Sequence, residues 1–218
     1  MNSAIIQLLV LAGIAIFLIL RLRSVLGTRE GFEKPRENLP RPDGARGTFE
    51  VIEGGVDRDI ADHVPEGSES ADALARMKRV ETSFGVSDFL GGARGAYEMI
   101  LMAFENGDLT DVKGFLSEDV YEAFQGVIDA RADQGLTVDA SFVGLSEMEL
   151  AGAEFNDETG EAELTVRFVA ELTSVVRDKS GDIVEGDANK IKRQRDVWTF
   201  ARTMGRDDPN WQLVATGA

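Results

Sequence analysis

The hydrophobic period of this chain changes at Gly135, and that change limits the folds open to it. Between residues 87 and 134 apolar side chains recur every three to four positions, which is typical of amphipathic helices. From Leu136 onward they alternate with polar side chains, most clearly over 161–172, as in half-buried strands. Helices followed by strands that are joined through hairpins predict an α+β fold, with the helices packed on a curved antiparallel sheet.

Cap residues, glycines and turn residues predict where these elements begin and end. The expected helices are 87–107, 108–116 and 117–135, and a further amphipathic segment is 70–80. The expected hairpin turns are 156–160, 177–182 and 205–210, the last of which separates strands 195–202 and 211–215. Gly91, Gly92 and Gly95 weaken the first helix, so we expect a helix, the sheet or lipid to approach its backbone there.

The N-terminal segment is apolar enough to cross a membrane. From Ala4 to Leu20 only Gln7 is strongly polar, and a helix of about 20 residues spans the ~30 Å core of a bilayer. No basic region precedes the run, which favours a retained anchor over a cleaved signal. Arg21 and Arg23 follow it, so the positive-inside rule predicts a single-pass protein with a cytoplasmic C-terminal domain.

Composition divides the rest of the chain into two parts. Residues 24–80 contain four of the five prolines and few large apolar groups, and we expect a flexible tether there. His63, the single histidine, falls in this segment, where we expect a solvated side chain. The anchor is then 1–23, the tether 24–80 and the folded domain 81–218.

The charge and the residue types exclude several functions. With 39 acidic and 23 basic residues the net charge is −16, which opposes binding to nucleic acid. The chain has no cysteine, so disulfides, thiolate metal sites and cysteine nucleophiles are excluded. We expect no metal, no cofactor and no catalytic residues, since Asp207 and Asp208 before Pro209 are typical of a turn.

Three segments carry a resemblance to a known family. FLGGARGAYEMILMAFENGDL, LTVRFVAELTSVVRD and above all DVWTFAR followed by DPNWQLVAT resemble the Tim44-like domain, over residues 84–218. This is the domain of the mitochondrial inner-membrane import-motor subunit, and the N-terminal span is similar to that of membrane-anchored alphaproteobacterial relatives. The resemblance implies a cystatin-like cone, akin to the nuclear transport factor two fold, with an apolar pocket and helices that lie on cardiolipin-rich membranes.

The resemblance also implies site residues, by matching position. The membrane-facing and lipid-contacting residues would be Phe89, Leu90, Arg94, Tyr97, Ile100 and Leu101. The pocket residues would be Phe168, Trp198, Phe200 and Trp211, although aromatic residues at alternate strand positions are also typical of a simple core.

A basic patch stands out from the otherwise acidic domain. Lys190, Lys192, Arg193 and Arg195 lie within six positions. They could hold an anionic lipid head group or an acidic partner segment. Equally, lysines on a solvated edge strand discourage pairing between sheets.

Three functions compete at this point. The first is a non-enzymatic, membrane-anchored adaptor that binds unidentified protein partners and membrane lipid in protein translocation or membrane-complex assembly. The alternative is a module that binds a lipid or a small apolar ligand in the cone. The third is an enzyme that uses Asp196 or Glu171 as a base, for which the sequence offers no partner donor.

Overall fold

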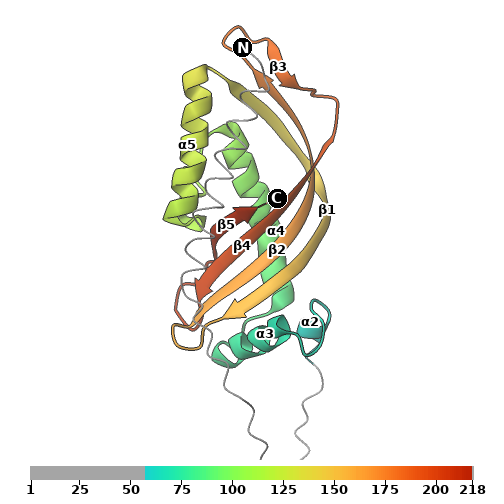
Figure 1. The fold of residues 1–218 in the computed structure, drawn as a ribbon, viewed down its shortest axis with the longest axis vertical. Helices are drawn as coiled ribbons and strands as arrows, with labels where there is room; N and C mark the ends of the chain where they lie inside the picture. The colour runs from blue at the N-terminus through green and yellow to red at the C-terminus, as the bar shows by residue number, and fades with distance from the viewer. Residues whose placement is uncertain (1–56, 218) are drawn as a thin grey trace, which may run out of the picture. The chain divides into compact units, whose positions relative to one another are not determined.

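The computed structural model describes residues 57–217, and they form helices followed by an antiparallel sheet (Figure 1). The expected anchor, 1–23, and the tether up to residue 56 lie outside these residues. Within the described part, no helix has the length and apolarity needed to cross a membrane. The helical elements are α2 (Arg58–Ala61), α3 (Glu69–Val80), α4 (Val86–Asn106), the 3-10 turn η2 (Lys113–Phe115) and α5 (Glu118–Gln134). The strands are β1 (Thr137–Phe155), β2 (Glu161–Arg177), β3 (Ile183–Gly186), β4 (Lys192–Thr203) and β5 (Gln212–Gly217).

The sheet has the order β1-β2-β4-β5, with β3 paired to the far end of β2. Every pairing between named strands is antiparallel, which confirms the expected mixed class. β2 is the central long strand, and its alternating apolar residues are at most 1% exposed: Ala162, Leu164, Val166, Phe168, Ala170 and Leu172. One face of the sheet is therefore the core face, as the alternation predicts.

β1 is a single strand of 19 residues, although its alternation of apolar and polar side chains is less regular than that of 161–172. Its register against β2 shifts at Phe142/Gly144, Leu145/Glu147 and Leu150/Gly152. Such bulges add residues to one strand and so break the alternation that identifies a strand in sequence. They also bend β1, whose curvature is visible in Figure 1.

The helix ends follow the expected chemistry with two corrections. Ser117 caps α5, and Gly107 and Gly135 end α4 and α5 in the left-handed conformation. The segment 108–116 is an Asx turn at Asp108 followed by η2 rather than an α-helix. The first long helix begins at Val86, and its N-cap, Gly85, has no side chain to bond the free N–H groups.

The folded part of the chain begins before residue 81. Helices α2 and α3 lie within the range 24–80 that the prolines indicated as a tether, and α3 corresponds to the amphipathic segment 70–80. Four large apolar side chains between residues 58 and 80 are at most 8% exposed and belong to the main core: Ile60, Val64, Leu74 and Met77. Periodicity is therefore a better guide here than proline content, because the free energy gained by burying four side chains offsets the entropy lost when a short segment is ordered.

Candidate functional site

The apolar residues expected to face a membrane lie on the sheet side of α4. Phe89, Leu90, Tyr97, Ile100 and Leu101 are all at most 7% exposed. They pack against the core face because they share the apolar stripe of one amphipathic helix. Arg94 is the member of this set that lies on the surface. In this conformation the five apolar side chains do not form a lipid-facing surface.

The outward side of α4 is open along its glycines. A Cβ atom at Gly91, Gly92 or Gly95 would meet no atom within 4 Å. The expected close approach to this backbone therefore does not occur within the described residues. Met99, 39% exposed, lies on the same helix.

The aromatic residues expected to line a pocket are packed together in the core. Phe168, Trp198 and Phe200 are at most 4% exposed, and Trp211 is half-buried. The Trp198 ring lies 5.8 Å from Phe168 and 6.3 Å from Phe200, between ring centroids. These positions are filled by one another's side chains, which fits the core interpretation that the sequence left open.

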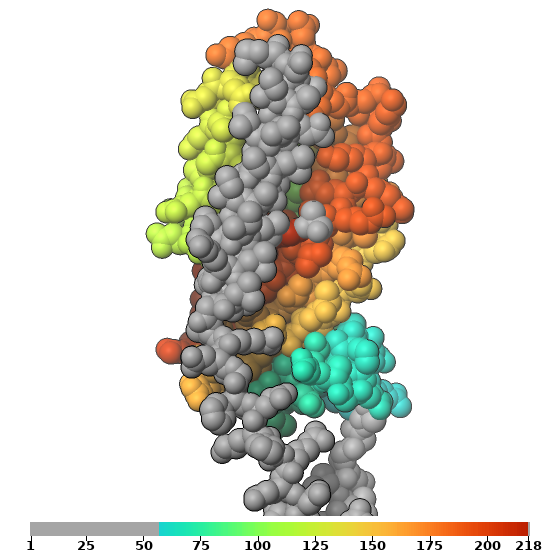
Figure 2. All heavy atoms as spheres, viewed as in Figure 1, coloured from blue at the N-terminus to red at the C-terminus, as the bar shows by residue number. Residues whose placement is uncertain are grey.

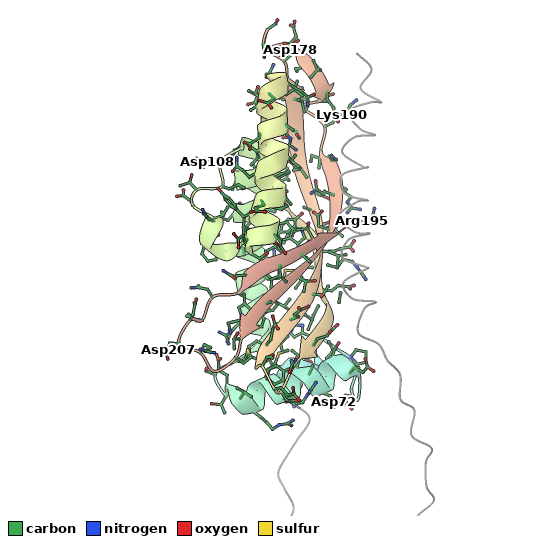
Figure 3. The ribbon with its side chains drawn as sticks, turned by 60° about the vertical axis from the view of Figure 1, so that its left-hand side comes forward. Asp72, Asp108, Asp178, Lys190, Arg195 and Asp207 are labelled. Carbon is green, nitrogen blue, oxygen red and sulfur yellow. The ribbon has the colours of Figure 1, made fainter. Side chains whose placement is uncertain are left out.

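The basic patch is divided between the two faces of β4. Successive side chains of a strand point to opposite faces, so Lys192 lies on the core face with Asp196, whereas Arg193 and Arg195 lie on the outer face. Lys190 precedes the strand, near the β3 end of the sheet, and Figure 3 shows Arg195 farther along β4. Arg193 Nε donates to Glu171 at 3.2 Å. The linear spacing suggested one basic surface, but the four cations do not form one.

The core face of β4 carries a hydrogen-bonded carboxylate, Asp196. The Tyr97 hydroxyl of α4 donates to Asp196 Oδ2 at 2.5 Å, and Gln194 Nε2 donates to the same oxygen at 3.0 Å. Burial raises the pKa of Asp196, and the two donors together with Lys192 only partly oppose that rise. Burial and the bond to Asp196 raise the pKa of Tyr97, so the tyrosine stays protonated and acts as a donor.

A second carboxylate, Glu105, lies near this group at the end of α4. Burial raises its pKa, while Arg131 of α5 and Lys192 of β4 lower it. Arg131 Nη1 lies 3.8 Å from Glu105 Oε2, and its guanidinium covers the Phe104 ring at 4.7 Å. Asp196 therefore joins β4 to α4 through the hydrogen bond from Tyr97, and Glu105 joins α4 to α5 through its ion pair with Arg131.

The contacts of this polar cluster join elements of the fold. Tyr97 and Gln194 both donate to Oδ2 of Asp196, which fixes this carboxylate against α4. Glu171, the other base considered, lies on the outer face and accepts from Arg193. Among residues 57–217, no group of three His, Asp or Glu side chains is placed to hold a metal ion.

Sequence reasoning missed a polar clasp that joins α2 to α4. Asp59 accepts from the backbone N–H groups of Val86, at 2.7 Å, and Ser87, at 2.9 Å, so it caps α4 from 27 residues away. Lys78 Nζ lies 2.8 Å from Asp59. Partial burial acts to raise the pKa of Asp59, but the bonds from Lys78, Ser87 and Val86 outweigh it and hold the pKa well below its usual range.

His63 takes part in this clasp. Its Nε2 lies 3.1 Å from the Ser87 hydroxyl, which itself donates to Asp59. The carboxylate contacts the serine directly, whereas in a catalytic triad the histidine stands between them. We therefore assign the three residues to capping of α4. No local sequence signal could have found a cap that comes from so far along the chain.

A second clasp involves the WTFAR segment and the turn that follows it, two of the stretches that carry the resemblance. Arg202, whose side chain is 8% exposed, donates to Glu81 Oε2 at 2.7 Å and to the carbonyl oxygen of Pro209 at 3.1 Å. Its guanidinium covers the Trp211 ring at 5.2 Å. The end of α3 is thereby fixed to the hairpin between β4 and β5. Arg202 and Trp211 therefore act structurally together, although they lie nine positions apart in the sequence.

The fold and these clasps define a domain of helices packed on an antiparallel sheet, in which polar contacts join elements that are distant in sequence. The family profile named Tim44-like domain matches residues 70–218, and the chain belongs to that family. Mitochondrial import inner membrane translocase subunit TIM44 of Homo sapiens is 26% identical over 154 residues, which is 69% of this chain and 34% of the human protein. Subunit TIM44-1 of Arabidopsis thaliana is 22% identical over 163 residues, 72% of this chain and 34% of the plant protein.

The chain thus spans about a third of the length of the curated relatives it matches. Among solved structures, the intermembrane space region of chloroplast protein ARC6 is similar with a TM-score of 0.39 and 11% identity, covering 59% of this chain and 94% of that one. So distant a likeness carries no functional argument.

Proposed function

We propose that this chain is a membrane-anchored, non-enzymatic adaptor in protein translocation or in the assembly of membrane complexes. The observation that carries the proposal is the Tim44-like domain over 70–218, together with relatives named as subunits of a mitochondrial inner-membrane import translocase. The relatives' names describe those proteins, and we transfer the role because the matched region is nearly the whole folded unit of this chain.

The membrane arrangement is part of the same proposal. Residues 1–23 would anchor the chain in a bacterial inner membrane, the segment up to residue 56 would tether the domain, and the domain would work at the cytoplasmic face. The curved sheet with its helices would correspond to a cystatin-like cone. Arg94 and Arg195 are two of the exposed cations that would contact anionic lipid head groups, beside Lys190, Lys192 and Arg193.

The adaptor role is favoured over an enzyme by how the buried polar groups are used. Asp196 is engaged by Tyr97 and Gln194, and Asp59 by Lys78 and Ser87. These contacts stabilise the domain and leave outward surfaces on α3, α4 and β4 for binding.

The test is crosslinking of the full-length protein in its native membrane, followed by mass spectrometry of proteins and lipids. A photoreactive residue is placed at Arg195 on the outer face of β4, and in a matched variant at Glu158 in the exposed turn between β1 and β2. We expect a defined set of proteins to crosslink at one of these two positions. The same proteins should be lost from a variant that lacks residues 1–23. Lipid alone, retained by that shortened variant, would contradict the adaptor role and support the ligand-binding alternative.

A further inference from the structure

We propose that a hollow between α2 and α3 binds an apolar side chain from a basic segment of a partner polypeptide. The α2–α3 hollow has a volume of about 280 Å³. It is lined by Asp57, Ile60, Ala61, Val64, Glu66, Gly67, Ala71, Asp72 and Ala75. This inference rests on the proposed adaptor function and names the chemistry of one partner surface.

Small side chains create the hollow. Ala71 and Ala75 lie one turn apart on the side of α3 next to its buried stripe, and Ala61 and Gly67 lie across from them. None of these side chains is long enough to fill the space between the two elements. The floor is apolar because Ile60 and Val64, at most 8% exposed, belong to the core. The hollow is thus lined by α2, by α3 and by the loop that joins them, with a floor that belongs to the core.

The rim is acidic. Among residues 57–217, the charged residues that line the hollow are Asp57, Glu66 and Asp72, and none of the lining residues there is basic. Lys78 pairs with Asp57 at 2.9 Å, which leaves Glu66 and Asp72 as exposed carboxylates at the opening. Figure 3 labels Asp72 at the end of the molecule formed by α3. In a chain of net charge −16, this rim attracts Lys or Arg beside the inserted apolar group.

Size and charge together select the occupant. Small-molecule sites typically hold roughly 300–1,000 Å³, so this hollow suits one or two side chains rather than a whole ligand. An anionic membrane surface is repelled by the rim. The α2–α3 segment forms part of the molecular surface in Figure 2. An amphipathic helix of a partner could therefore reach it and lay its apolar face there.

The probe is a fluorescent amphipathic peptide of about 14 residues, roughly four helical turns, with leucines on one face and lysines on the other. Its binding to the full-length protein in phosphatidylcholine nanodiscs is measured by anisotropy, with empty nanodiscs subtracted. Two further peptides replace leucine by serine or lysine by glutamate. We expect both replacements to weaken binding at least about tenfold, since each removes one of the two complementary features.

Two variants fill the hollow. Ala71→Leu does so from α3 and Ala61→Leu from α2, so a folding defect in one still leaves the other to decide. Each is expected to weaken the leucine–lysine peptide about tenfold, the effect of excluding one apolar side chain from its site. Ala123→Leu, at an exposed alanine of α5, is the matched control and should leave binding unchanged.

A charge pair tests the rim. Glu66→Gln with Asp72→Asn should weaken the peptide severalfold and reduce the dependence of its affinity on salt. Glu122→Gln with Glu158→Gln removes two exposed carboxylates elsewhere and should do neither. Equal effects of the two charge variants, or no effect of the filling variants, would overturn the proposal.

The two proposals can fail separately. If crosslinking recovers partners while the filling variants bind the peptide normally, the adaptor role stands and the hollow is not its docking site. If the filling variants lose the peptide but no partners are recovered, the hollow binds basic segments and the adaptor role fails.

Discussion

The two halves of β4 have the same alternating pattern but opposite environments. In the C-terminal half, Trp198 and Phe200 are at most 4% exposed and contact the aromatic residues of α4. In the N-terminal half, Lys192, Arg193 and Arg195 are exposed, and the neighbouring Ile191 is 58% exposed. Beyond it, every residue of β3 is exposed.

The difference teaches that alternation assigns a side chain to a face but does not say what covers that face. α3 and α4 pack on β1 and α5 packs on β5, and in Figure 1 β3 lies at the end of the sheet farthest from α3. Stability should therefore concentrate in the half of the sheet that α4 covers. The remaining half keeps charged and apolar side chains in contact with solvent.

The largest effect should come from the covered half. Trp198→Ala removes a buried ring that contacts Tyr97, Phe168 and Phe200, and we expect it to cost about 3–5 kcal/mol of unfolding free energy. Ile191→Ala in the exposed half is the matched control and should stay within about 0.5 kcal/mol. Urea unfolding followed by circular dichroism measures both. Similar losses for the two variants would contradict the comparison.

The next effect should come from the clasp between α3 and β4. Arg202→Ala leaves Glu81 without its cation and removes the cover of Trp211, so we expect a loss of about 2 kcal/mol. Arg195→Ala on the outer face of the same strand removes an exposed arginine and should cost less than about 0.5 kcal/mol. The same urea titration compares the two. If Glu81→Gln in the Arg202→Ala background restores nothing, the lost ion pair is not the reason for the instability.

Acid titration should separate two carboxylates whose pKa values shift in opposite directions. The pKa of Asp59 is lowered, so its stabilising contribution is present above the unfolded value of about 4 and is lost as pH falls toward the folded value. The pKa of Asp196 is raised, so its contribution is present at low pH and is lost as pH rises through the folded value.

The two Asn variants should therefore respond with opposite signs. Asp59→Asn is expected to cost about 1 kcal/mol at pH 7, the value of a helix cap, and less at acidic pH. Asp196→Asn should become more destabilising relative to the natural protein as pH falls from 7. Unfolding free energies measured along this range give both trends. Parallel trends would mean that burial does not govern Asp196.

The sequence predicts most of the local structure because helix ends and strand faces are set by nearby residues. Ser117, Gly107 and Gly135 end helices where their chemistry indicates, and the apolar face of 161–172 is the buried face of β2. The errors occur where a distant contact decides. Residues 57–80 fold because of core contacts, despite their polar composition.

The candidate sites were harder to predict because they depend on which faces meet. The four cations near β4 are neighbours in sequence, yet the strand divides them between two faces. Asp59 and Ser87, or Glu81 and Arg202, come together only through the fold, at separations of 28 and 121 residues. No periodicity encodes such pairs, although the family resemblance did identify the segment that contains Arg202.

The smallest effect should distinguish the two sides of α4. A Cβ atom at Gly92 would meet nothing within 4 Å, so Gly92→Ala should stabilise the domain by about 0.5–1 kcal/mol through helix propensity. Gly107→Ala is the matched control and should destabilise it, because Gly107 has a φ of +76°. Thermal unfolding of the full-length protein in nanodiscs and in detergent compares the two variants. A Gly92→Ala variant that is destabilised only in nanodiscs would mean that lipid approaches the outward side of α4, and the open surface described here would then be a membrane contact.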